Sequence, residues 1–161
     1  MTTSLDLPPP PEPALGSEWT LTSLADAGPG SRAYAAAPRG GGPVAELRLY
    51  RVQHHPLRAC YPYGAHDIGL GLILPDRSET GQELVPRLLG GLVPALFAAD
   101  PLCRRVVAAP AEDDTATQTA LANGGFHRVT EADLPGGSVV LFTAEPAWLA
   151  DLPTALDDMP H

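Results

Sequence analysis

The strongest constraint on the fold is the order of apolar runs and turns between His66 and Phe126. The stretch opens with HDIGLGLILPD, an apolar run of strand length that ends at a proline and a charged residue. A polar loop with one glycine follows, and a second apolar run covers Arg105 to Ala109 and ends at Pro110. Short continuous apolar runs are typical of buried strands. The stretch therefore predicts two interior strands, the first at 67–74.

Between and after these runs the spacing of apolar residues is helical. From Gly81 to Ala98 they recur at three- and four-residue intervals, which predicts a helix of about five turns: Leu84, Val85, Leu88, Leu89, Leu92, Leu96 and Phe97. Pro86 is tolerable near its start, whereas Pro94 is predicted to kink or shorten it. Residues 115–123 predict a second, short helix that ends at Asn123-Gly124-Gly125, where glycine accepts a left-handed conformation. The result is a strand–helix–strand–helix unit.

The segments before and after this unit supply further strands. Alternation predicts strands at Glu18–Leu24, Pro43–Val52 and Val139–Thr143. In the second of these, Val44, Leu47, Leu49 and Tyr50 are the apolar members, and Arg48 and Arg51 are predicted to face solvent. Ala25–Gly42 is rich in glycine, alanine and proline without an amphipathic period. We expect it to be a loop with at most one helical turn.

The 161 residues predict a single domain with loose ends. Residues 1–16 contain Pro8 to Pro11 and Pro13, a composition that favours disorder or polyproline conformation. The compact domain is expected over residues 17–145. Residues 146–161 are acidic and interrupted by proline, so we expect a loosely ordered tail.

Charge and residue usage exclude several classes of protein. The net charge of −9 opposes nucleic-acid binding, which needs a basic footprint. All ten basic residues are arginine, which excludes the lysine of a phosphate-binding loop and a Schiff-base mechanism. Cys60 and Cys103 are too few for a disulfide framework. No basic start precedes an apolar segment and no apolar run approaches about 18 residues, so we expect a cytoplasmic protein that does not enter membranes.

Four stretches in order carry a family resemblance. They are PVAELRLYRV, HHPLRACYPYGAHDIGLGLIL, LFAADPLCRRVVAAP and ANGGFHRV, spread over residues 43–143. Together they resemble the GNAT superfamily of acyl-CoA-dependent N-acyltransferases. The resemblance is to its siderophore-biosynthesis branch, which acylates the side-chain amine of lysine or N-hydroxylysine.

The resemblance implies an α/β fold with a mixed, mostly antiparallel sheet that is splayed at its centre and flanked by helices. It implies that acyl-CoA lies in the split as co-substrate, without a metal. The pantetheine arm would pair with the backbone of Leu72, Ile73 and Leu74. The pyrophosphate would lie at the glycine loop and the helix start, on Arg77, Gly81 and Gln82, because a helix N-terminus attracts anions.

The sequence departs from the family pattern at functional positions. Gly71 stands where the branch has a histidine, and Ala111 stands where it has an aspartate after Pro110. Asp76 and Glu79 bring negative charge to the expected phosphate site. Ala25–Gly42 has no pattern for the two helices that the family places there, so the first helical layer is expected to be shortened. That wall of the acceptor pocket is then absent or supplied by a second subunit in a homodimer.

Other residues are candidates for the missing chemistry, each with a structural alternative. His66 and Asp67 lie close to the vacant histidine position, but each also fits a strand start. Asp113, between Glu112 and Asp114, could replace the missing carboxylate, although acidic residues also stabilise helix starts and Asp114 suits an N-cap.

Further polar residues give weaker indications. His54, His55, Cys60 and His66 match no standard zinc spacing, so no metal site is predicted. Arg104 and Arg105 beside Cys103 could lower the pKa of its thiol, but packing explains this cysteine better. Tyr61 and Tyr63 either line a pocket or edge the sheet.

Three functions remain open from the sequence. The first is an N-acyltransferase that moves an acyl group from acyl-CoA to the amine of a small molecule in siderophore or other secondary metabolism, because positioning alone accelerates such reactions strongly. The second is a catalytically degenerate relative that binds a metabolite, an acyl carrier or a partner protein. The third is a cleft used for other chemistry, because a fold does not fix a function.

Overall fold

The computed structural model describes residues 8–25, 28, 30–61, 63–75 and 78–147. These residues form a seven-stranded sheet in the order β1-β2-β3-β4-β5-β7-β6, and the only parallel neighbours in it are β4 and β5. The strands are β1 Trp19–Ser23, β2 Arg32–Pro38, β3 Ala45–Arg51, β4 Ile68–Ile73, β5 Val106–Ala108, β6 His127–Leu134 and β7 Gly137–Ala144. The helices are α1 Glu79–Ala99 and α2 Thr115–Asn123, with short 3₁₀ turns η1 Val52–His54 and η2 Pro56–Ala59. The mixed, mostly antiparallel architecture is the one expected.

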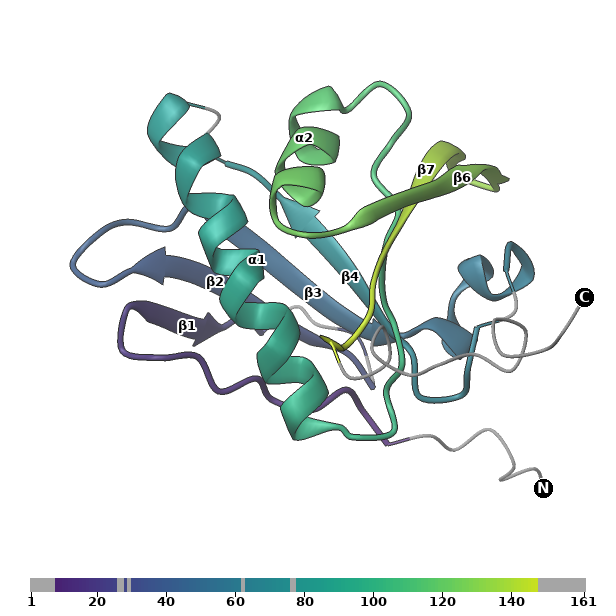
Figure 1. Cartoon of the computed structure of the whole chain (residues 1–161), viewed down its shortest axis with the longest axis horizontal. Coiled ribbons are helices and arrows are strands. Elements are labelled where there is room, and N and C mark those ends of the chain that lie inside the picture. Colours follow the sequence, from purple (N-terminus) through teal and green to yellow (C-terminus); the bar gives the residue numbers. More distant parts are fainter. Residues whose placement is uncertain (1–7, 26–27, 29, 62, 76–77, 148–161) are drawn as a thin grey trace, which may run out of the picture.

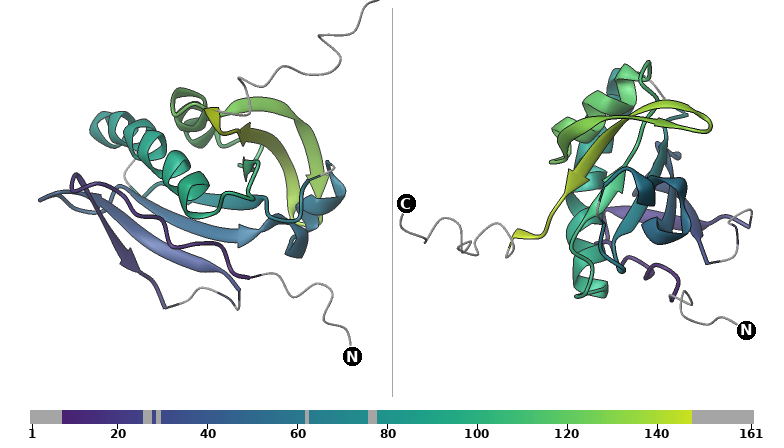
Figure 2. Two further views of the ribbon diagram at one scale, coloured as in Figure 1. Left: turned by 60° about the horizontal axis from the view of Figure 1, so that its bottom comes forward. Right: turned by 90° about the vertical axis from the view of Figure 1, so that its right-hand side faces the viewer.

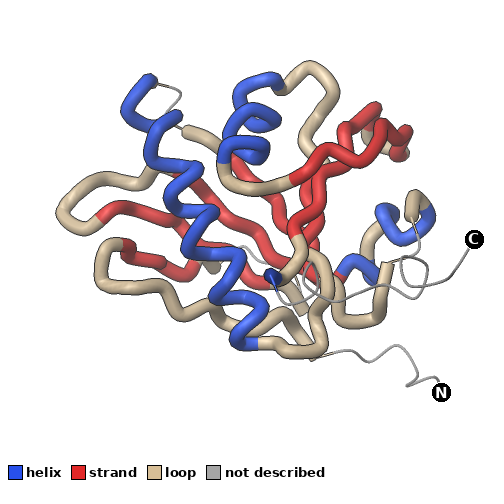
Figure 3. Tube along the Cα trace, viewed as in Figure 1, coloured by secondary structure: helices blue, strands red, loops and turns tan. Residues whose placement is uncertain are grey.

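The β4–α1–β5–α2 unit is confirmed and lies at the centre of the molecule (Figure 1). Helix α1 crosses one face of β1–β4, and its apolar residues form the main core with the inward side chains of those strands. The β6–β7 hairpin stands apart from β1–β4, as the tube view shows (Figure 3). It curves out of the plane of those strands (Figure 2, left).

The expectation of a loop at Ala25–Gly42 is wrong for most of its length. Strand β2 occupies Arg32–Pro38 and pairs with β1 on one side and β3 on the other. Alanine has a low strand propensity and marks neither face of a strand, so this stretch shows no apolar–polar alternation. They suit an interior strand, because Ala33 and Ala36 are buried and leave room for larger neighbours. The connection from β1 to β2 is left with only residues 24–31, so the first helical layer is indeed shortened.

Strand β6 was not predicted from the sequence. It pairs only with β7, and six of its eight residues are exposed, so it lacks the apolar side that marks a strand. Arg128 and Glu131 form an ion pair on its surface. Charged side chains on an edge strand discourage pairing with another chain.

Helix α1 runs through both of its prolines. Pro94 does not shorten the helix, which continues to Ala99. Pro94 has no N–H, so the carbonyl of Gly90 lacks its helical hydrogen bond. Both residues lie on the exposed side of the helix. Water can therefore satisfy that carbonyl, while Leu92 and Leu96 remain in the core.

Arg51 does not face solvent as expected. Its side chain is 3% exposed and lies on the α1 side of β3, the same side as Leu47 and Leu49. Its Nη1 donates to the carboxylate of Asp100 at 2.8 Å and to the carbonyl of His66 at 2.7 Å. Strict alternation places residue 51 inward, and the strand end supplies enough oxygens to satisfy the buried guanidinium.

The start of the described chain packs on this arginine. Nε of Arg51 donates to the carbonyl of Pro8 at 3.0 Å, Nη2 donates to that of Pro9, and Nε of Arg32 donates to that of Pro10. Leu15 packs against the main core. Residues 8–10 and Leu15, in the segment for which we expected disorder or polyproline conformation, therefore contact the domain. Residues 1–7 and the predicted tail beyond 147 lie outside the described residues.

Candidate functional site

The sheet opens between β4 and β5. The two strands pair only at Ile68↔Val106 and Gly69↔Val107. Beyond this point β4 stays with β3 as far as Ile73, whereas the chain after β5 follows β7 through the bridge Ala111↔Val139. Because each strand continues along its outer neighbour, the inner edges separate and leave a slot.

The slot carries backbone groups without a strand partner. Val52 N–H donates to the Asp67 carbonyl on the β3 side, while Ile68 N–H donates to the Arg105 carbonyl on the β5 side. Backbone groups alternate in direction along a strand, so those of Leu70 and Leu72 also point to the β5 side. Leu72 lies beyond the last paired residue of β5. Its N–H and C=O are thus presented to whatever occupies the slot.

The slot is a cavity of 270 Å³ between β4, the end of β5 and α2. Gly71 and Ala111, the positions where the resemblance implies a histidine and an aspartate, both line it. A Cβ on Gly71 would meet the Cβ of Arg48 at 3.4 Å, so the position has room for a side chain. The N-cap Asp114 accepts from Thr117 N–H at 3.2 Å and fixes the α2 wall, as the sequence predicted.

The expected pyrophosphate end lies where α1 begins. Ser78 caps the helix, with its Oγ accepting from Gly81 N–H at 3.3 Å and its carbonyl accepting from Gln82 N–H at 2.9 Å. Gln82 also lines a second 270 Å³ cavity between α1 and α2. Leu74 is buried at the end of the slot strand, and Arg77 lies outside the described residues. A phosphate that accepts from Gly81 N–H has to replace the Ser78 hydroxyl there.

An aromatic pair lies on the other face of the slot. The ring of Tyr50 stacks on His55 with centroids 4.7 Å apart, and it lies across Gly69, where a Cβ would come within 2.0 Å of a ring carbon. Burial raises the pKa of the Tyr50 hydroxyl, which keeps it protonated. His55 Nδ1 accepts from Leu57 N–H at 3.1 Å, and burial lowers the pKa of its imidazole.

Two cavities flank this pair. One of 440 Å³ is lined by Arg32, Arg48, Tyr50, His55 and Gly71, among others. The other, of 930 Å³, lies beneath the β6–β7 turn. Its lining includes His55, Ala109, Ala111, Glu112 and Asp113. Each cavity shares lining residues with the slot, and we refer to the three together as the cleft.

His66 and Asp67 lie away from the slot, at the paired end of β4. The Asp67 carboxylate is 1% exposed and accepts from the N–H groups of Gly64, Arg104 and Arg105 at 2.8–3.2 Å. It holds the two strand starts together. His66 offers its carbonyl to Arg51, and its buried Nδ1 finds no hydrogen-bond partner among the described residues.

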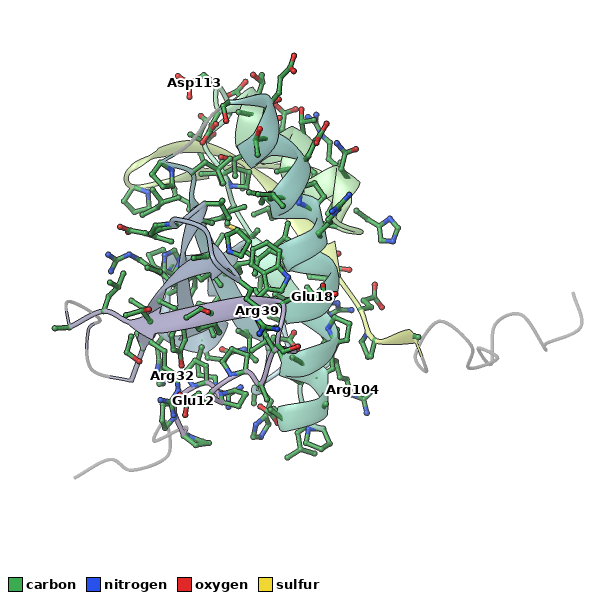
Figure 4. The ribbon with its side chains drawn as sticks, turned by 90° about the vertical axis from the view of Figure 1, so that its left-hand side faces the viewer. Glu12, Glu18, Arg32, Arg39, Arg104 and Asp113 are labelled. Atoms are coloured by element: carbon green, nitrogen blue, oxygen red, sulfur yellow. The ribbon has the colours of Figure 1, made fainter. Side chains whose placement is uncertain are left out.

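Asp113 lies at the opposite end of the molecule from Arg104 (Figure 4). It is exposed on the loop after β5 and faces the 930 Å³ cavity with Glu112. Of His66, Asp67 and Asp113, only Asp113 lines the cleft. This loop is where the family carboxylate at position 111 would stand.

The remaining polar candidates have structural roles. Burial raises the pKa of the Cys103 thiol to about 12, and its Sγ donates to the Arg105 carbonyl. The neighbouring arginines therefore do not activate it. Tyr61 and Tyr63 pack on each other and against the cluster of Val107 and Leu141 on the interior strands β5 and β7, and burial raises the pKa of Tyr63 to about 12. The described residues contain no cluster of three or more histidine, cysteine or acidic side chains able to hold a metal ion.

Sequence reasoning missed Tyr50, His55 and Arg48 as cleft residues. Tyr50 was counted as an apolar strand member and Arg48 as a solvated one. Their alternation with Leu47 and Leu49 does place both on the side of β3 away from the core, which was the available signal. His55 was considered only as a metal ligand, and nothing in the spacing of the residues indicates that it stacks on Tyr50. No described helix is long and apolar enough to cross a membrane.

Comparisons with known proteins agree with this geometry. The model of the acetyltransferase (GNAT) domain family matches residues 18–134. Lysine N-acyltransferase MbtK from Mycobacterium sp. (strain MCS) is 28% identical over 117 residues, which are 73% of this chain and 48% of that protein. The same enzyme from Mycobacterium tuberculosis (strain ATCC 25618 / H37Rv) is 28% identical over 99 residues, which are 62% of this chain and 47% of that protein. The chain thus spans about half the length of these relatives.

Solved structures share the fold. An uncharacterized protein of Bacillus halodurans (bh2621) superposes with a TM-score of 0.63 at 25% identity, covering 71% of this chain and 58% of its own. The aminoglycoside acetyltransferase AAC(6')-Ib, solved with paromomycin and acetyl-CoA, gives 0.63 at 19% identity, covering 78% and 70%. With the family model matching most of the chain and the sheet splayed at its centre, the protein belongs to the GNAT family of acetyltransferases.

Proposed function

We propose that this protein transfers an acyl group from acyl-CoA to the amine of a small molecule in siderophore or other secondary-metabolite biosynthesis. The observation that carries the proposal is the slot between β4 and β5, where the backbone groups of Leu72 face open space. The named relatives are lysine N-acyltransferases, and AAC(6')-Ib was solved with acetyl-CoA, which supports both the donor and the amine acceptor.

The donor would extend along the slot. A pantetheine arm carries amide groups, which can bond to the Leu72 N–H and C=O as a missing strand would. Of the expected residues, Ile73 has its backbone groups on the β3 side, so Leu72 and Leu74 are the better candidates. The phosphates would reach the start of α1 near Gly81 and Gln82, where backbone N–H groups and the helix dipole favour an anion.

The reaction would be aminolysis of the thioester. The neutral amine attacks the carbonyl carbon, a C–N bond forms, the C–S bond breaks and the thiolate leaves. The Leu72 N–H is a candidate donor to the oxyanion that forms. Tyr50 lines the slot and burial raises the pKa of its hydroxyl, so this group stays protonated and is a candidate to return a proton to the thiolate. The proton of the amine would pass to water or to Asp113, since positions 71 and 111 carry no base.

Calorimetric titration with acetyl-CoA and palmitoyl-CoA tests the donor site. We expect one molecule of thioester to bind per chain. Leu72→Pro removes the N–H that faces the slot, and it should weaken binding at least tenfold. Leu72→Ala keeps the N–H and serves as the matched control. If neither thioester binds, or if a folded Leu72→Pro protein binds as tightly as the Leu72→Ala control, the acyltransferase proposal is wrong.

A binding protein without catalysis is the second candidate. The observation that favours it is that Gly71 and Ala111 line the slot where the family has its acid–base groups. Release of free thiol from bound acyl-CoA in the presence of amines separates the two candidates. Binding without thiol release over a panel of diamines, amino acids and aminoglycosides would favour the degenerate relative. No thioester binding at all would favour a cleft used for other chemistry.

A further inference from the structure

The two halves of an acyl-CoA would meet different surroundings in this protein. The pantetheine arm is uncharged and carries amide groups, whereas the nucleotide half carries the negative charges of its phosphates. Of the described residues that line the slot, only Arg48 and Asp114 are charged. Arg48 forms an ion pair with Glu46. The Asp114 carboxylate accepts from the N–H and the hydroxyl of Thr117. The slot therefore suits an uncharged chain of amides better than an anion.

The backbone N–H groups expected to hold the pyrophosphate already have acceptors. Ser78 Oγ accepts from Gly81 N–H at 3.3 Å, and the Ser78 carbonyl accepts from Gln82 N–H at 2.9 Å. The second of these is a regular helical bond, so a phosphate can gain only the first, and only by removing the serine cap. The net gain is therefore smaller than at a helix start without a side-chain cap.

The charge around this turn is negative. Glu79 and Glu83 are exposed in the first turns of α1. The start of α2 lies at the same end of the molecule (Figure 1), and Glu112, Asp113 and Asp114 immediately precede this helix. Carboxylates oppose the approach of another anion, and exposed ones act through solvent over a Debye length of about 10 Å at 0.1 M salt. This end of the molecule therefore repels a nucleotide phosphate.

The cavity between the two helices does not compensate for this repulsion. Its described lining consists of hydroxyl, amide and methyl side chains, and it includes no arginine, lysine or histidine: Gln82, Thr115, Ala116, Thr119, Ala120 and Asn123. Phosphates in proteins are typically neutralised by arginine or lysine. A nucleotide seated here would thus keep its charge without a described cation to balance it.

We propose that the protein recognises its acyl donor by the pantetheine arm alone and gains no affinity from the nucleotide. The unpaired backbone groups of Leu72 supply the amide recognition, and the start of α1 supplies a repulsion that offsets what its backbone offers to phosphate. The acyl donor is then any pantetheine thioester, with or without a nucleotide. The proposal rests on the proposed function, because it takes the slot to be the site of the acyl donor.

Three thioesters that differ only beyond the pantetheine arm test this proposal. They are S-acetylpantetheine without phosphate, S-acetyl-4′-phosphopantetheine and acetyl-CoA. By calorimetry on the full chain at low salt, we expect S-acetylpantetheine to bind at least as tightly as acetyl-CoA, with the phosphorylated arm between them. Added salt should tighten acetyl-CoA and leave S-acetylpantetheine unchanged, because salt screens exposed charges. Acetyl-CoA that binds at least tenfold more tightly than S-acetylpantetheine would overturn the proposal, as would salt that weakens acetyl-CoA.

Charge variants locate the repulsion. Glu79→Gln with Glu83→Gln should tighten acetyl-CoA by about threefold to tenfold and leave S-acetylpantetheine unchanged. The control removes the same charge elsewhere, by Glu18→Gln with Glu145→Gln. Glu18 lies well away from the start of α1 (Figure 4), and neither control residue lines the slot. Circular dichroism verifies that each variant is folded. Equal changes in the two double variants would overturn the proposal.

Arg77 provides a separate test, because it precedes the helix and lies outside the described residues. We expect Arg77→Gln to leave the affinity for both acetyl-CoA and S-acetylpantetheine unchanged. A tenfold loss confined to acetyl-CoA would identify Arg77 as a phosphate ligand and overturn the proposal.

Thiol release separates this proposal from the proposed function. Similar kcat/KM values for S-acetylpantetheine and acetyl-CoA with the same amine support both. If acetyl-CoA binds and reacts while S-acetylpantetheine does neither, the acyltransferase stands and recognition by the arm alone is wrong. If S-acetylpantetheine binds but no thioester releases thiol, recognition by the arm stands and the acyltransferase is wrong. If none of the three thioesters binds, both are wrong.

Discussion

The two ends of the β4–β5 pair are built in opposite ways. At the strand starts, the Asp67 carboxylate bridges the chain before β4 and the chain before β5, and Arg51 satisfies the adjacent carbonyls and Asp100. At the strand ends, Leu72 has no β5 partner and Gly71 has no side chain to fill the space.

The difference explains how a sheet can hold an open slot. Unpaired backbone is costly when it is buried, and two parted strands tend to close or fray. Buried ionic hydrogen bonds at one end fix the angle between the strands, since such networks are rigid when every member is satisfied. We infer that the closed end acts as the rigid corner from which the open end diverges.

Breaking the closed end should have the largest effect. Arg51→Ala removes a 3% exposed guanidinium that pairs with the Asp100 carboxylate and donates to the carbonyls of Pro8, Pro9 and His66. Removing one member of a buried ion pair costs about 3–5 kcal/mol. Urea unfolding measures this loss. Arg48→Ala, on the same strand but one-third exposed, is the control and should cost less than about 1 kcal/mol. Similar losses in the two variants would show that the closed end is not the anchor.

Filling the open end with the family's groups should raise activity. Gly71→His with Ala111→Asp restores a base and a carboxylate in the slot, and general-base catalysis typically supplies about 10²–10⁴-fold. We expect about 100-fold in kcat/KM at the lower end of this range, measured by thiol release from acetyl-CoA with lysine as acceptor. Gly71→Asn with Ala111→Asn matches the volume without the acid–base groups. A double variant no faster than this control would mean that positions 71 and 111 do not face the reacting atoms.

Two glycines of β4 should respond differently to the same methyl group. A Cβ on Gly69 would lie 2.0 Å from the Tyr50 ring, whereas one on Gly71 would lie 3.4 Å from Arg48 Cβ. Overpacking of this kind costs about 1–3 kcal/mol, so Gly69→Ala should lower the melting temperature and Gly71→Ala should change it little. Equal shifts would mean that the Tyr50 ring moves aside freely.

The smallest effect concerns pH. Burial lowers the pKa of His55 below that of the unfolded chain, so the unfolded state takes up a proton first as the pH falls. The stabilisation from neutral His55 is present above about pH 6.5 and decreases below it. Urea midpoints at pH 7.5 and 5.5 should differ more in the native protein than in His55→Gln. An unchanged difference would assign the pH dependence to other groups.

The sequence predicts the elements whose signals are local. Helix α1 follows from its apolar spacing, and α2 follows from the Asp114 cap and the glycine pair after it, where Gly125 has a φ of 99°. Strand β2 is not predicted, because its alanines show no apolar–polar alternation. The burial of these alanines depends on the neighbouring strands β1 and β3. The position of β2 in the sheet is therefore determined by its pairing with β1 and β3 and not by a local sequence pattern.

The site is predictable only in part. The slot and its vacant positions Gly71 and Ala111 follow from the family resemblance, and the structure opens there. The Tyr50–His55 stack joins a strand to a turn, and Arg51 meets Asp100 over 49 residues. Contacts of this kind depend on how the folded elements pack, so the spacing of residues in the sequence does not predict them. The expected homodimer stays a prediction.

The way in which residues 8–10 bind to the domain determines which positions of this chain tolerate substitution. Arg51 and Arg32 hold that segment through main-chain oxygens alone. An extended segment without internal hydrogen bonds leaves its main-chain carbonyl oxygens available whatever its side chains are. Proline residues lower the conformational entropy that the segment loses when it packs on the domain. Substitutions at the exposed positions 8 and 9 should be nearly silent, whereas Pro10 is buried and the two arginines that hold the segment are constrained by their contacts.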